Sequence, residues 1–176
     1  MKLAVLLVAV GAGALVLVGP GGASADPFRE LGLIRPGKTT AAPGFDVPAL
    51  GGARLRLADL RRKVVFLNFW ATWCPPCREE MPSMERAHHR HRDRGLTIVA
   101  LALDCEPDPV VAFVQSLGLT FPIGLDPGFE VANRYAVRAP PSSFLIDRQG
   151  AVVAVALGPR DWDGNAARAV FESMLR

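Results

Sequence analysis

The stretch Val64-Val65-Phe66-Leu67-Asn68-Phe69-Trp70-Ala71-Thr72-Trp73-Cys74-Pro75-Pro76-Cys77 decides the fold of this chain. Its first seven residues form a nearly continuous apolar run, which predicts a strand buried on both faces. A helical pattern follows, and two cysteines at i and i+3 of a helix start lie on one face at a separation that suits a disulfide. The sequence therefore predicts a redox pair where a buried strand passes into a helix.

Cys74 is the expected nucleophile of this pair. A helix N-terminus offers unpaired N–H groups and partial positive charge, which favour the thiolate, and the thiolate is the attacking species. A structural disulfide would close too small a loop to gain much chain entropy, and zinc requires four ligands where the chain has three cysteines and no histidine near the pair. An inactive relative of a redox enzyme is an alternative that the sequence leaves open.

The first 25 residues have the pattern of a secretory signal. Met1-Lys2 supplies the charged start, Leu3 to Val18 the apolar middle and Ala23-Ser24-Ala25 the small-residue exit. Cleavage after Ala25 and retention as a membrane anchor are both open. Either outcome predicts the bacterial periplasm or the extracytoplasmic face of the membrane, where disulfides form and persist.

The remainder is long enough for one domain, so we expect three parts: residues 1–25 as signal or anchor, 26–41 as a poorly ordered tether and 42–176 as the folded domain. The net charge is +3, and the basic residues are not interleaved with aromatic ones. Nucleic-acid binding is therefore not expected.

Strand and helix patterns alternate through most of the chain, which predicts parallel pairing. A hairpin is expected around Gly51-Gly52 and another around Arg148-Gln149-Gly150. The helix after the cysteines should run to about Arg94, with a kink at Pro82 and an end at Gly95. The other expected strands are 96–103, 120–125, 143–147 and 151–157, and the other expected helices are 109–117, 128–135 and 163–175, the last with Asp163 as N-cap.

With these motifs placed, the chain resembles the thioredoxin superfamily, and within it the TlpA/ResA/CcmG group of exported thiol-disulfide oxidoreductases, related to the AhpC/TSA and Redoxin families. Asn68 to Pro82 and Tyr135 to Asp147 carry the resemblance. It implies an α/β thioredoxin-like fold, with a central mixed sheet flanked by helices and an extra strand and helix before a cis-proline at Pro141. It also implies reduction of protein disulfides, often on apocytochrome c or a copper-oxidase assembly factor, and a membrane thiol electron donor.

The resemblance marks Cys74 and Cys77 as catalytic, with Trp73, Glu80 and Pro141 in support. Glu80 lies at i+3 from Cys77 and shares its helix face, so it is either a proton carrier for the buried thiol or an ordinary surface acid. No cofactor beyond the Cys74–Cys77 disulfide and no metal are expected.

Three departures bear on mechanism. Asn68 stands where cytoplasmic thioredoxins carry a buried carboxylate. Pro75 and Pro76 lack N–H groups, so they stabilise the Cys74 thiolate less than a motif with histidine between the cysteines would. A less stabilised thiolate makes the couple less oxidising, which favours a reductase. Pro140 has no N–H to offer to a substrate strand, which predicts a weaker backbone grip.

The remaining features are weaker signals. Cys105 is expected to be a half-buried free thiol. His88, His89 and His91 lie among arginines and are expected to form a solvated face rather than a metal site. The alternatives to a reductase are a thiol oxidase or isomerase on the same fold, and a copper-carrying metallochaperone.

Overall fold

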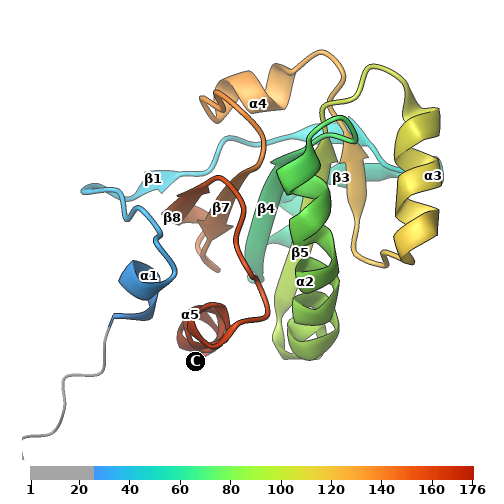
Figure 1. Ribbon diagram of the computed structural model, residues 1–176. Helices are drawn as coiled ribbons and strands as arrows, with labels where there is room; N and C mark the ends of the chain where they lie inside the picture. The colour runs from blue at the N-terminus through green and yellow to red at the C-terminus, as the bar shows by residue number, and fades with distance from the viewer. Residues whose placement is uncertain (1–25) are drawn as a thin grey trace, which may run out of the picture.

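The computed structural model describes residues 26–176, so the predicted signal or anchor lies outside the described residues. A six-stranded mixed sheet forms the centre of the domain (Figure 1), with strand order β1-β8-β7-β4-β5-β6. The strands are β1 Thr40–Ala41, β4 Val64–Trp70, β5 Leu96–Ala102, β6 Ile123–Leu125, β7 Ser142–Ile146 and β8 Ala151–Leu157, and a separate hairpin consists of β2 Asp46–Pro48 and β3 Arg54–Arg56.

The pairing directions confirm the expected mixed sheet. β4 and β6 are both parallel to β5, whereas β7 is antiparallel to β4 and to β8. β6 and the short helix α4 (Glu130–Arg134) precede β7 in the chain. They form the strand and helix that we expected before Pro141.

β4 is buried along its whole length because helices and loops cover both faces of the sheet. On one face, Phe66 packs against Trp162 and Phe171, with ring centroids 4.3 and 5.8 Å away. On the other, Phe69 packs against Tyr135 at 5.4 Å. Alternate residues of the strand thus enter two apolar layers, which explains the continuous apolar run.

The helix that follows the cysteines is α2. It continues into a 3-10 turn and ends at Gly95, whose φ of 100° is a left-handed conformation that suits glycine. Pro82 lies inside α2. The helices are α1 Pro27–Glu30, α2 Pro75–His91, α3 Pro107–Leu117, α4 Glu130–Arg134 and α5 Asn165–Leu175, with 3-10 turns at Leu57–Leu60 and Arg92–Arg94. No helix within residues 26–176 is both long and apolar enough to cross a bilayer.

Two local expectations were wrong. The expected tether, residues 26–41, contains α1 and β1, and its Leu33 is buried against the domain. A helix cap at Asp163 is also absent, since α5 begins two residues later with Gly164 as its N-cap. Asp163 instead binds Arg86, Arg90 and Arg168, because its buried carboxylate gains more from three guanidinium groups than from backbone N–H groups.

Candidate active site

The two cysteines at the start of α2 form a disulfide, with their Cα atoms 5.3 Å apart. Cys74 is the N-cap residue, and its sulfur accepts a hydrogen bond from the backbone N–H of Cys77 at 3.3 Å. Pro75 and Pro76 occupy the positions between them and have no N–H to add. Cys74 is 5% exposed and Cys77 is fully buried, so a partner sulfur approaching from solvent reaches Cys74 first.

A buried carboxylate holds the loop that delivers Cys74. Asp104 follows β5 and accepts hydrogen bonds from the backbone N–H of Thr72, at 3.2 and 3.0 Å, and from the Thr72 hydroxyl. β4 and β5 are parallel, so their carboxyl ends meet at one sheet edge and bring the two residues together. Our sequence reasoning missed Asp104, although its place directly after a predicted buried strand was a usable signal.

Trp73 is 60% exposed beside Cys74. An indole left in solvent next to a reactive sulfur offers apolar contact area to whatever protein approaches that sulfur.

Glu80 is buried, 3% exposed, on the same face of α2 as Cys77, whereas Glu79 is exposed. One carboxylate oxygen, Oε1, accepts from Asn68 Nδ2 at 2.9 Å. The other, Oε2, accepts from the backbone N–H of Arg160 at 3.1 Å and from Trp162 Nε1 at 2.9 Å. The expectation of an ordinary surface acid is therefore excluded.

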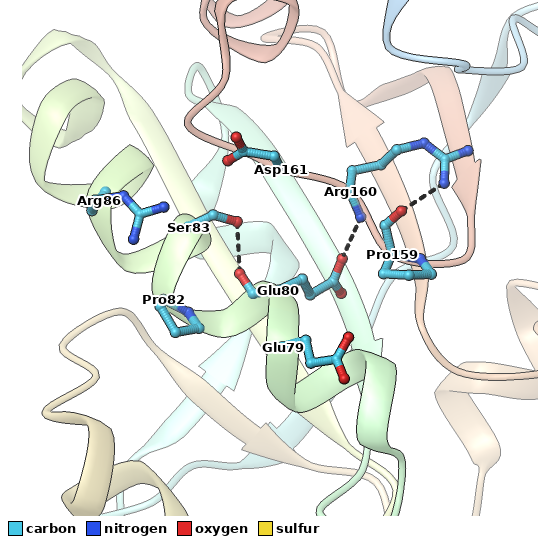
Figure 2. Close-up of a pocket in the computed structure, with 8 residues that line it drawn as sticks. All are labelled: Glu79, Glu80, Pro82, Ser83, Arg86, Pro159, Arg160 and Asp161. Carbon is cyan, nitrogen blue, oxygen red and sulfur yellow. Dashed lines mark hydrogen bonds between the residues drawn. The ribbon is translucent and has the colours of Figure 1, made fainter.

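Burial raises the pKa of Glu80 to about 7, while the hydrogen bonds from Trp162, Arg160 and Asn68 oppose the rise. An acid with a pKa near neutrality exchanges its proton in both directions at physiological pH. Glu80 also lines a cavity of about 480 Å³ (Figure 2), together with Glu79, Pro82, Ser83, Arg86, Pro159, Arg160 and Asp161.

Asn68 bridges the acid to the sheet. Its Nδ2 donates to Ser143 Oγ at 2.9 Å as well as to Glu80, and its Oδ1 is buried without a partner in the described residues. The partners of the Asn68 amide are side chains and not backbone groups. Asn68 on β4 thus donates a hydrogen bond to the carboxylate of Glu80, which lies on α2.

The peptide bond between Pro140 and Pro141 is cis, as the resemblance implies. Pro141 is buried and directly precedes Ser142, which pairs with Phe69 near the carboxyl end of β4. The topology therefore places Pro141 at the sheet edge from which the cysteine loop leaves.

The prediction that His88, His89 and His91 form a solvated face was wrong for two of the three residues. His88 is 9% exposed and His91 is fully buried, and burial lowers the pKa of both. Only His89 lies outside, 2.8 Å from Glu85. The reason is periodicity, since positions 84, 87, 88 and 91 share the inner face of α2.

Two further candidates lie apart from this chemistry. Cys105 is an exposed free thiol rather than a half-buried one. Among residues 26–176, no group of three or more His, Cys, Asp or Glu side chains is arranged to hold a metal ion.

A six-stranded thioredoxin-like sheet with a disulfide at a helix start defines the class of thiol-disulfide oxidoreductases. The family model described as AhpC/TSA family matches residues 39–155, and the chain belongs to this family, in its thiol-disulfide oxidoreductase branch.

The similar proteins agree with this assignment. The thiol-disulfide oxidoreductase ResA of Bacillus anthracis is 44% identical over 117 residues, covering 66% of this chain and 68% of the relative. ResA of Bacillus subtilis is 40% identical over 117 residues, covering 66% and 65%. The crystal structure of a thiol:disulfide interchange protein, DsbE, from Chlorobium tepidum, described as putative, superposes with a TM-score of 0.74 at 33% identity, covering 79% of this chain and 98% of that one.

Proposed function

We propose that the chain is an extracytoplasmic reductase of protein disulfides. The observation that carries this proposal is the disulfide at the start of α2, with Cys74 slightly exposed at 5%, Cys77 fully buried and a carboxyl of pKa about 7 on the same helix face. The substrate class is a folded or unfolded protein with an accessible disulfide. Apocytochrome c and a copper-oxidase assembly factor are the candidates that the family resemblance offers.

The reaction begins with the reduced enzyme. The Cys74 thiolate attacks one sulfur of the partner's disulfide, the partner's S–S bond breaks, and its other sulfur leaves as a thiolate that takes up a proton. Cys77 then gives its proton to the Glu80 carboxylate and attacks Cys74. The Cys74–Cys77 disulfide forms, the partner's second thiolate is released, and Glu80 passes the proton on.

The electron pair thus moves from the enzyme to the partner, and a second dithiol must return it. We propose a membrane thiol protein as this donor, with residues 1–25 as the export signal or anchor. The direction is supported by the two prolines, because they can add no N–H donor to the one that the Cys74 sulfur receives in the disulfide form, that of Cys77, and the thiolate would therefore be poorly stabilised. A poorly stabilised thiolate makes the couple less oxidising.

Trapping in the native host tests the proposal. Cys77→Ser should leave a partner bound to Cys74 through a disulfide that dithiothreitol releases, and the Cys74→Ser/Cys77→Ser double variant is the matched control. The reduction potential should lie in the reducing part of the range of roughly −270 to −120 mV that exchange proteins span. Equal capture by both variants, or a potential at the oxidising end with oxidation of reduced substrates, would contradict a reductase.

A further inference from the structure

Residues 26–34 are folded back onto the domain. The side chain of Asp26 caps α1 through the Phe28 N–H at 3.1 Å, and Leu33 is 9% exposed. Ile34 exchanges two backbone hydrogen bonds with Val155 of β8, at 2.8 and 2.9 Å. α1 lies beside α5 (Figure 1). This N-terminal segment, residues 26–34, is therefore docked on the domain in a defined position.

Arg160 lies in the loop between β8 and α5, and its side chain binds both the N-terminal segment and this loop. Its Nε donates to the carbonyl oxygen of Leu31 at 2.8 Å, and Nη2 donates to that of Gly32 at 3.1 Å. Nη1 donates to the carbonyl oxygens of Leu157 and Pro159, at 3.3 and 2.8 Å. One guanidinium thus fixes the N-terminal segment and the loop in a single arrangement.

The approach at Gly32 is close. Its φ is +69°, and a Cβ built there would lie 3.4 Å from Arg160 Nη2. A side chain at this position would strain the backbone and press on the guanidinium.

Arg160 also contacts the buried Glu80, through its backbone N–H. The Arg160 N–H donates to Glu80 Oε2 at 3.1 Å (Figure 2), beside the Trp162 indole. The position of the Arg160 N–H therefore depends on the loop between β8 and α5, which the N-terminal segment helps to hold.

The charged groups around Glu80 come from two elements. Arg160 and Asp161 lie on the loop before α5, and Glu79 and Arg86 lie on α2 at the cavity that Glu80 borders. From the sheet, Asn68 binds Glu80 and in turn binds Ser143, and both of these side chains are neutral.

We propose that Arg160 is a positioning residue through which the docked N-terminal segment sets the proton affinity of Glu80. The relevance of this coupling to disulfide exchange rests on the proposed function, whereas the coupling itself does not. Undocking residues 26–34 frees the loop, weakens the Arg160 N–H contact and favours the protonated acid. The segment that leads toward residues 1–25 is thereby linked to the redox centre.

The test is a titration of the full chain labelled with ¹⁵N-tryptophan. The Trp162 indole N–H binds Glu80 directly, so its resonance reports the ionisation of that carboxyl; Trp162→Phe assigns it among the three tryptophans. Arg160→Ala should move the midpoint upward by about one pH unit, since a hydrogen bond to an ionised group is weakened.

Two variants separate positioning from simple charge. Arg160→Lys keeps the charge but loses the fork, and it should shift the midpoint nearly as far as Arg160→Ala. Leu33→Asn adds no charge and leaves Arg160 in place; it should shift the midpoint in the same direction, and combining it with Arg160→Ala should add little. Arg134→Ala is the matched control, because Arg134 also holds a backbone carbonyl, that of Gly44 at 2.7 Å, away from Glu80.

A wild-type midpoint in Arg160→Lys or in Leu33→Asn would overturn the coupling, as would an equal shift in Arg134→Ala. Failure of the proposed function looks different. In that case the midpoints shift as described, but Cys77→Ser captures no more partner protein than the Cys74→Ser/Cys77→Ser double variant.

Discussion

The two ends of α2 both bury titratable side chains but surround them differently. Near the redox pair, Glu80 receives three hydrogen bonds and borders a cavity. Near the other end, neither ring nitrogen of His91 has a partner among residues 26–176, and its ring packs 5.7 Å from that of Phe171.

Hydrogen-bond donors that point at a carboxylate stabilise its ionised form, so Glu80 at the start of α2 can both bind and release a proton. Apolar packing around an imidazole only keeps it neutral. The same helix therefore carries a chemical site at its start and a packing site at its end, and the number of hydrogen-bond donors distinguishes them.

The largest expected effect is on catalysis. Glu80→Gln should slow disulfide exchange at pH 7 by roughly 100-fold, because Cys77 loses its proton acceptor. Stopped-flow oxidation of the reduced enzyme by a disulfide peptide measures this rate. Glu79→Gln, on the exposed neighbour, is the control and should be silent; an unchanged rate in Glu80→Gln would make the start of α2 a packing site like its end.

The second effect is on the pH dependence of stability, where the two ends should oppose each other. The pKa of Glu80 is raised from 4.5 to about 7, so between these values the folded protein holds a proton that the unfolded chain has lost, and stability falls as pH rises. The pKa values of His88 and His91 are lowered from 6.5, so below that pH the unfolded chain gains protons first and stability falls as pH falls.

Urea unfolding of the disulfide form across pH 4 to about 8 separates the two slopes. Relative to wild type, Glu80→Gln should gain stability as pH rises, up to about 3 kcal/mol above pH 7, since that is the cost of ionising a carboxyl with this pKa. A difference that stays constant with pH would show that Glu80 titrates in the folded protein as it does in the unfolded chain.

A smaller effect is expected from the other end of the helix. His91→Leu should raise the free energy of unfolding at pH 7 by about 1 kcal/mol, because two unpartnered buried nitrogens are removed, and exchange activity should not change. Chemical denaturation and the same stopped-flow assay measure both. His89→Leu, on the exposed side, should give no such gain; lost activity in His91→Leu would assign chemistry to this end too.

The smallest effect lies between the two ends. Arg86 is 57% exposed and 3.3 Å from Asp163, so Arg86→Ala should cost between about 0 and 1 kcal/mol. Thermal unfolding at low and at high salt measures the cost. Arg92→Ala is the control, because Arg92 lies 3.9 Å from Asp93 and both side chains are exposed. A larger loss would mean that this contact, and not the apolar face, holds α2 against the loop before α5.

The sequence predicted those features whose signals are local. Val64 to Trp70 had to be a strand buried on both faces, and Cys74 and Cys77 had to meet on one helix face. The hairpin at Gly51-Gly52 and the helix end at Gly95 followed in the same way. Each depends on residues within a few positions of one another, where periodicity and turn chemistry apply.

Only the tertiary structure decided which side chains meet. The sequence allowed Glu80 to be a surface acid, and its donors Arg160 and Trp162 lie 80 and 82 residues away. The support of the cysteine loop by Asp104 and the docking of Leu33 are long-range contacts of the same kind. Burial and hydrogen bonding across such separations fix a carboxyl's proton affinity, and no local pattern of residues encodes them.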